Sequence, residues 1–153
     1  MPKKIAWGGI DPGQKGQVCL LTENEIRFYK WHGETRSAHN LEKRNQEFNI
    51  KFCLEQIDDV RKPGFNVPGK LLVNYGFWRG VLTSNHCNWV SKTPRQWQTI
   101  MPDSSKKWKC KKDRSLFWAK EFYPVIKGIL IQKKDHDRSD PLLMAHFLRQ
   151  TEI

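Results

Sequence analysis

Three short apolar segments, separated by tight polar turns, open the chain and constrain its fold more than any other feature. They cover Ile5–Ile10, Gln17–Thr22 and Ile26–Trp31. The connecting segments read DPGQKG and ENE, and such short turns join strands that run in opposite directions. The sequence therefore predicts an antiparallel meander of three strands at the start of the protein.

Strand and helix patterns alternate along the rest of the chain. Ser37–Phe48 is polar and rich in helix formers, and fits either a helix or a loop over one sheet face. Ile50–Leu54 has strand character, and the segment HCNWVSKTP contains a fifth strand that leads into a helical turn around Trp97. Helical patterns cover LLVNYGFWRGVL, Ser115–Phe122 and the closing DHDRSDPLLMAHFLRQ, with Pro141 expected in the first turn of that last helix.

These patterns predict an α/β protein with a five-stranded mixed sheet, three antiparallel strands followed by parallel strands, flanked by helices. The crossover into Ile50–Leu54 makes that strand parallel to the first. We expect residues 1–153 to form a single domain, because a 38% hydrophobic content with seven Trp and eight Phe suffices for one core. Gly76 and Gly80 lie four residues apart on one helix face, which suggests close backbone packing there.

Carboxylates stand at the ends of two of the predicted strands. Asp11 directly follows the first strand, and Glu55 follows the fourth. Ligands of open sheets bind beyond the carboxyl ends of parallel strands, so both acids are expected at one edge. Asp137 and Asp140 are three residues apart near the start of the closing helix and share a face. If that helix end points at the edge, four carboxylates converge.

Four converging carboxylates would repel one another, and divalent cations would neutralise them. Ligands that are all oxygen suit Mg²⁺ or Mn²⁺. Each acid taken singly has an ordinary structural explanation: turn chemistry before Pro-Gly, a solvated strand end, or a helix cap. Their ordered combination on a basic chain favours a metal site.

The chain is strongly basic, with 27 Lys and Arg against 16 Asp and Glu and a net charge of +11. This favours nucleic acid as the partner, with an anionic membrane surface as the second possibility. A basic run surrounds Trp108, which would either stack on a base or anchor its loop. We expect the run to bind phosphates, the alternative being a solvated loop. The predicted DNA-binding residues are Lys106, Lys107, Lys109, Lys111, Lys112 and Arg114, with Lys15, Arg61 and Lys62 as further candidates.

The remaining aromatic and cysteine residues carry weaker signals. Phe65 would be either a core plug, which we favour, or an apolar wedge in DNA.

The four cysteines form no Cys-x-x-Cys pair, which indicates reduced thiols in a cytosolic setting. No apolar run approaches the length of a membrane span, and no signal or transit peptide pattern is present. The tryptophans expected in the core are Trp7, Trp78, Trp89, Trp97 and Trp118.

The order of these motifs resembles that of RuvC-type Holliday junction resolvases, and of the phage-type branch in particular. The segments that carry the resemblance are GIDPGQKG, LEQI and HDRSDPLLMAHFL, joined by TPRQWQ, KKDRSLFWAKEFYP and NYGFWRGVL. It extends over most of residues 5–150, whereas Gly33–Asn49 carries no such likeness.

The resemblance implies an RNase H-like fold, a homodimer, and metal-dependent cleavage of four-way DNA junctions by paired symmetric nicks. It implies no membrane and no small-molecule cofactor, and a cytoplasmic location, that of the host if the protein is phage-encoded. It carries catalytic and metal-binding roles onto Asp11, Glu55, Asp137 and Asp140, with two Mg²⁺ or Mn²⁺ ions per site. His136, four residues before Asp140, is a second candidate for the role of Asp137, although the spacing of three favours Asp137. Pro141 stands where the family usually has a small helix former such as Ala.

Three other functions share some of these features. A different RNase H-like nuclease, acting on flaps or RNA–DNA hybrids, would use the same acids. A non-catalytic DNA-binding relative would keep the fold, but the presence of all four acids argues against it. DPGQKG also resembles the first phosphate loop of sugar-kinase-like ATPases, which need a duplicated fold for which we expect 153 residues to be too few.

Overall fold

A computed structural model of the protein describes residues 1–13, 17–30, 34–57, 69–129 and 136–152. The strands in these ranges are β1 (Lys4–Ile10), β2 (Gln17–Leu21), β3 (Ile26–Lys30), β4 (Phe48–Glu55) and β5 (Asn88–Lys92). The helices are α1 (Glu34–Glu47), α2 (Gly69–Ser84), α3 (Pro94–Trp97), α4 (Lys111–Phe122) and α5 (His136–Thr151), with short 3₁₀ turns η1 (Gln98–Ile100), η2 (Ser105–Lys107) and η3 (Pro124–Ile126).

The five strands form one mixed sheet in the order β3-β2-β1-β4-β5. β1, β2 and β3 pair in antiparallel fashion, as the short turns predict. β4 pairs in parallel with β1, and β5 in parallel with β4. The predicted architecture is therefore confirmed, including the parallel placement of the fourth strand.

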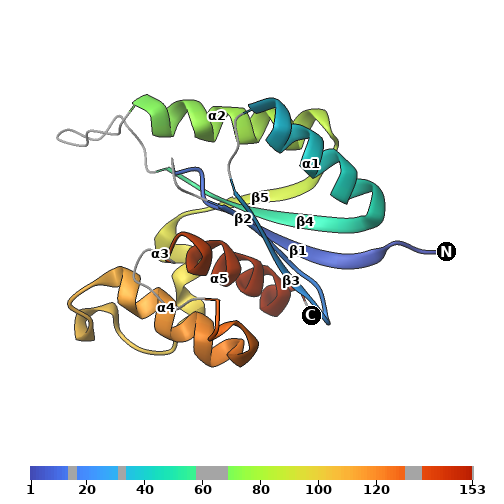
Figure 1. The fold of residues 1–153 in the computed structure, drawn as a ribbon. Coiled ribbons are helices and arrows are strands. Elements are labelled where there is room, and N and C mark those ends of the chain that lie inside the picture. Colours follow the sequence, from blue (N-terminus) through green and yellow to red (C-terminus); the bar gives the residue numbers. More distant parts are fainter. Residues whose placement is uncertain (14–16, 31–33, 58–68, 130–135, 153) are drawn as a thin grey trace.

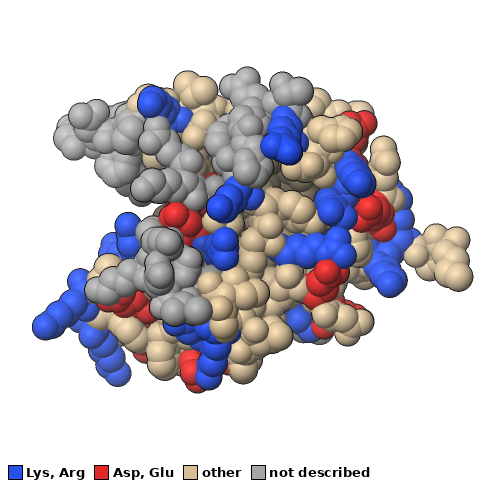
Figure 2. Space-filling model, viewed as in Figure 1, with Lys and Arg blue, Asp and Glu red and all other residues tan. Residues whose placement is uncertain are grey.

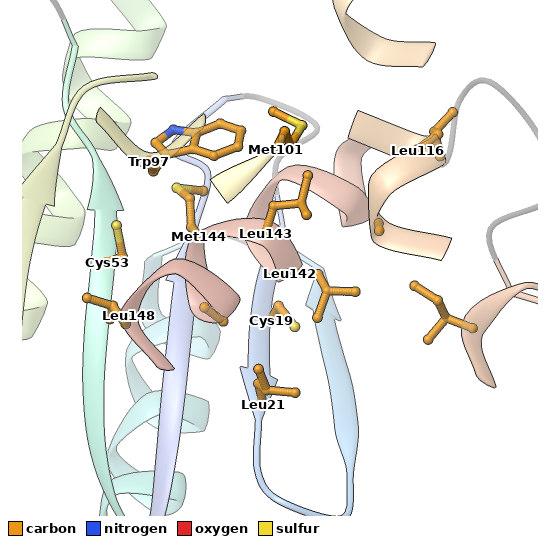
Figure 3. Packing of buried hydrophobic residues seen from close by; sticks show 13 residues of the cluster. Cys19, Leu21, Cys53, Trp97, Met101, Leu116, Leu142, Leu143, Met144 and Leu148 are labelled. Atoms are coloured by element: carbon orange, nitrogen blue, oxygen red, sulfur yellow. The ribbon is translucent and has the colours of Figure 1, made fainter. Parts of the chain in front are cut away.

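Helices cover both faces of this sheet (Figure 1). α1 and α2 lie on one face, where their side chains join a core cluster with Ile10, Phe52 and Leu54. α5 lies against the other face, and α4 packs on the outside of α5. Figure 3 shows the side chains of α5 against those of the strands in this second cluster. The sheet is thus the middle layer, with β1 in its centre.

Two glycines in β1 allow its neighbours to approach closely. A Cβ atom on Gly8 would lie 2.2 Å from the Phe52 ring, on the face covered by α1 and α2. A Cβ atom on Gly9 would lie 1.8 Å from the carbonyl oxygen of Pro141 in α5. Such distances exclude a side chain, so the backbone of α5 rests directly on the central strand.

The structure decides one open question about the helices and corrects three expectations. The segment left open between helix and loop is α1, and α4 begins at Lys111, four residues earlier than predicted. Pro141 is the sixth residue of α5, so its expected place in the first turn is wrong. The close packing expected at Gly76 and Gly80 is also wrong within the described chain, because nothing lies within 4 Å of a Cβ built on either residue.

The tryptophans expected in the core are confirmed there. Trp78 and Trp97 are buried, while Trp7, Trp89 and Trp118 are partly buried and pack against the two clusters. None of the described helices is both long enough and apolar enough to cross a lipid bilayer.

Candidate active site

Asp11 continues the central strand by one residue beyond its end. Its N–H donates to the carbonyl oxygen of Gln17 at 3.2 Å, which extends the β1–β2 pairing to Asp11. The N–H of Gly13 donates to Asp11 Oδ1 at 2.9 Å and closes a tight turn. The turn chemistry considered as the ordinary explanation of Asp11 is therefore present. It also fixes the orientation of the carboxylate at the edge of the sheet.

Glu55 is the last residue of β4 and lies beside Asp11 in the sheet. Ile10 pairs with Leu54 in the parallel register, which makes Asp11 and Glu55 the next positions on neighbouring strands. The indole Nε1–H of Trp97 donates to Glu55 Oε2 at 3.0 Å. Trp97 is 1% exposed and lies in the core cluster that Figure 3 shows, so this bond holds the carboxylate from inside the core.

The start of α5 lies at the same edge. The helix runs from the side of the molecule where β1 and β4 end (Figure 1). The contact between Gly9 and Pro141 fixes this placement, because Asp140 immediately precedes Pro141 and Asp11 follows Gly9 by two residues. Asp137 lies one turn earlier on α5, and both aspartates are half-buried.

The backbone thus brings the four predicted acids to one edge, but their side chains do not form a ready-made cage. Among the described residues, no three Asp, Glu, His or Cys side chains are grouped closely enough to hold a metal ion. The chemistry of the four side chains nevertheless fits a hard divalent cation, since all their ligand atoms are oxygens. Their supports are rigid: a central strand, a buried indole and a helix resting on a glycine.

His136 is the first residue of α5, and its side chain is outside the described part of the structure. The preference for Asp137 over His136 as a ligand therefore stays a prediction. Lys15, Arg61, Lys62 and Phe65 also lie outside the described residues.

The lysines of the basic run are exposed, but Arg114 is not. Lys106 and Lys107 lie in η2, Lys109 follows in the loop, and Lys111 and Lys112 begin α4. Figure 2 shows Lys and Arg side chains projecting at the lower left, over α4 and the loop before it.

Arg114 is buried, and its Nε donates to Asp103 Oδ1 at 2.9 Å. It also donates to the carbonyl oxygens of Met101 and Asp103. The assignment of Arg114 to DNA binding was therefore wrong, because its donors serve the fold.

Asp103 binds two residues of the basic run and one residue beyond it. Its carboxylate accepts from Trp108 Nε1 at 2.5 Å and Trp118 Nε1 at 2.9 Å, in addition to Arg114. Desolvation raises the pKa of Asp103, but the hydrogen bonds from Arg114, Trp108 and Trp118 outweigh it and lower the pKa to about 2. The sequence left open whether Trp108 stacks on a base or anchors its loop. In the structure its indole is bound to Asp103 and its ring packs against Phe117, so Trp108 anchors the loop.

Two residues at this edge escaped the sequence analysis. Lys92 ends β5 and pairs with Glu55 in the parallel register, which places a cation next to the acids. The sequence did contain a signal for Lys92: it is the last residue before the Thr93-Pro94 helix start, and therefore the end of the fifth strand. Gln17 begins β2 opposite Asp11 and is buried, although its glutamine side chain gave no reason to expect this.

The strand order, the pairing directions and the helices on both faces define the RNase H-like fold. Among solved structures, T. thermophilus RuvC in complex with a Holliday junction substrate has this fold, with a TM-score of 0.51 and 14% sequence identity. The match covers 97% of this chain and 96% of the RuvC chain. A second Thermus thermophilus RuvC structure matches over 95% of this chain and 96% of its own, with 14% identity and a TM-score of 0.49. No protein-family model and no curated protein sequence matches this chain.

Proposed function

We propose that this protein is a divalent-metal-dependent endonuclease that resolves four-way DNA junctions. One observation carries the proposal: neighbouring parallel strands end in Asp11 and Glu55, and α5 brings Asp140 to the same edge through the contact of Pro141 with Gly9. The RuvC structure with the same fold was solved with a Holliday junction, which makes branched DNA the first substrate to test.

The four acids would hold two Mg²⁺ or Mn²⁺ ions. Such ions lower the pKa of a bound water and stabilise the oxygen that leaves when a phosphodiester is hydrolysed. Asp11, which follows the central strand of the sheet, would be the fixed reference of the site, and the Trp97 indole would hold the carboxylate of Glu55 in place. Lys92, next to Glu55, is placed to offset the negative charge of an incoming phosphate.

Binding of the DNA backbone would come from the exposed lysines around Trp108. These lysines flank Trp108 and lie before Arg114, both of which hydrogen bond to Asp103, so we expect little further ordering of the segment on binding. The net charge of +11 supports the same partner. The four cysteines are free, as in proteins of the reducing cytoplasm, where we place this one.

A homodimer would match the two-fold symmetry of a junction that is nicked twice. α2 offers a face for this contact, because Leu72 is 39% and Val73 61% exposed beside the uncovered Gly76 and Gly80. Light scattering at micromolar concentration should give about twice the chain mass of 18.1 kDa. A purely monomeric protein, with and without junction DNA, would remove the dimer from the proposal.

The function can be tested with a labelled immobile four-way junction incubated with Mg²⁺, Mn²⁺ or EDTA. We expect paired nicks on opposite strands with either metal and none in EDTA. Unlabelled junction, flap and RNA–DNA hybrid should be added as competitors in parallel reactions. Preferential inhibition by the hybrid or the flap would instead assign the protein to another RNase H-like activity.

A further inference from the structure

Gln17 is a polar side chain buried next to the proposed metal site. It is 9% exposed, and its Oε1 atom is fully buried and accepts no hydrogen bond from the residues that the structure describes. Buried polar atoms nearly always have a partner, and an amide oxygen without one destabilises the folded protein. We therefore expect the Oε1 atom of Gln17 to accept a hydrogen bond from a donor that is present only when a ligand is bound.

The sheet places Gln17 directly across from Asp11. Ile10 pairs with Val18, and the Asp11 N–H donates to the Gln17 carbonyl at 3.2 Å, so the two residues form the next antiparallel pair. Side chains of such a pair stand on the same face, with Cβ atoms roughly 5 Å apart.

That shared face is the one covered by α5. Along β2, Val18 belongs to the cluster under α1 and α2, whereas Cys19 belongs to the cluster under α5. Strand alternation therefore directs Gln17 to the α5 side. In β1, Gly9 contacts α5 and Ile10 faces the other way, so Asp11 also belongs to the α5 side.

We propose that Gln17 is a positioning residue for the divalent cation: its Oε1 accepts a hydrogen bond from a water molecule coordinated to the cation that Asp11 holds. This inference rests on the proposed metal site. Hard cations such as Mg²⁺ keep several of their waters in proteins, and these waters are strong donors. An acceptor opposite Asp11 orients one of them and satisfies the amide oxygen at the same time.

The inference can be tested without DNA or cleavage, by binding Mn²⁺ alone. Free Mn²⁺ is measured by electron paramagnetic resonance, and the unfolding midpoint is recorded in EDTA and in Mn²⁺. Gln17→Met replaces the amide by an apolar group of similar length. It should raise the unfolding midpoint in EDTA, because the unpartnered oxygen is gone, and weaken Mn²⁺ binding by about 10- to 100-fold.

Two further variants complete the comparison. Gln17→Glu keeps an oxygen acceptor at the same reach, so Mn²⁺ affinity should equal or exceed that of the wild type. Its unfolding midpoint in EDTA should fall, because a charge is buried. Gln150→Met, at an exposed position late in α5, should leave both quantities unchanged.

The outcomes separate the role of Gln17 from the metal site itself. Unchanged Mn²⁺ affinity in Gln17→Met, or a lower midpoint in EDTA, would overturn the role of Gln17 while leaving the metal site intact. If wild type and Asp11→Asn bind Mn²⁺ equally weakly, the metal site fails and the role of Gln17 falls with it.

Discussion

A buried indole holds the carboxylate of Glu55 at the end of β4. Trp97 is 1% exposed and donates to Glu55 Oε2 at 3.0 Å, so a core residue and a proposed metal ligand depend on each other. The Gly13 N–H plays a similar part for Asp11. At the scale of residues, the site is therefore held by donors that do no chemistry themselves.

Trp97→Phe keeps an aromatic ring but removes the donor to Glu55. We expect a loss of about 2–4 kcal/mol in the free energy of unfolding, from the lost bond and the smaller ring. Cleavage at saturating junction should fall about tenfold, since a misplaced ligand weakens the metal site. Urea denaturation and single-turnover cleavage measure the two effects. Trp118→Phe, which removes the indole donor to Asp103, should lose stability but keep its cleavage rate.

His146 makes the stability of the protein depend on pH. Burial and the nearby Arg149 lower the pKa of His146 from 6.5 to about 4, and its Nδ1 shares a 2.6 Å hydrogen bond with the Tyr123 hydroxyl. Between these pH values the unfolded chain binds the proton and the folded protein does not, so stability falls as the pH drops from about 6.5 to about 4. Because His146 is only half-buried, we expect a loss of about 1–2 kcal/mol.

His146→Gln should remove most of this pH dependence. Urea midpoints of the two proteins, recorded at steps from pH 7 to pH 4, provide the comparison. Parallel curves for variant and wild type would show that other groups cause the acid sensitivity.

At the scale of elements, the contact between α5 and β1 determines whether the helix can deliver Asp140 to Asp11. Gly9→Ala places a methyl carbon 1.8 Å from the Pro141 carbonyl oxygen, which belongs to the backbone of α5 and cannot move aside as a flexible side chain can. We expect a loss of at least about 3 kcal/mol in unfolding free energy and a loss of cleavage. Gly128→Ala is the matched control, since open space surrounds Gly128, and it should keep the stability and the cleavage of the wild type. Wild-type stability in Gly9→Ala would refute the close contact.

The lysine segment should account for a defined part of the salt dependence of DNA binding. Replacing Lys106, Lys107, Lys109, Lys111 and Lys112 by Gln should weaken binding to junction and duplex alike. If about three of them contact phosphate, the slope of log affinity against log salt should shrink by roughly 3, at about 0.9 per phosphate. Binding across a salt series on both DNAs measures this. An unchanged slope would mean a solvated surface, and a selective loss of junction binding would mean that this segment recognises shape.

The sheet and its strand directions followed from the sequence because turn lengths and apolar alternation are local signals. The edge position of Asp11 and Glu55 followed in turn from the strand ends. α1 stayed open between helix and loop, because a polar segment with Leu41 as its one described side chain in the core carries little local pattern. The helix is selected by packing over β4.

Arg114 and Gln17 show where local signals fail. Arg114 has the same charge as the lysines around it, but α4 begins at Lys111 and turns Arg114 inward with Ser115 and Ala119. A helical pattern extended back to Lys111 would have revealed this burial. The burial of Gln17 depends on α5, which lies more than a hundred residues away in the sequence, so no local pattern could indicate it.

At the scale of the whole molecule, the proposed function would divide binding and cleavage between a basic surface and an acidic edge. In the proposed function, the net charge of +11 would draw the protein to any nucleic acid, whereas selection of a junction would come from the geometry of two matched sites. Binding and cleavage should therefore be separable by one substitution in the acidic edge.

Asp11→Asn is that substitution, and the measurement is nicking of a labelled four-way junction in Mn²⁺, with binding of the same junction recorded in parallel. Asn keeps the size of the side chain and removes the charge that holds the cation. We expect paired nicks by the wild type, none by the variant, and junction affinity that is equal or slightly higher in the variant, because repulsion of phosphate is relieved. Equal nicking by the two proteins would contradict the proposed metal site.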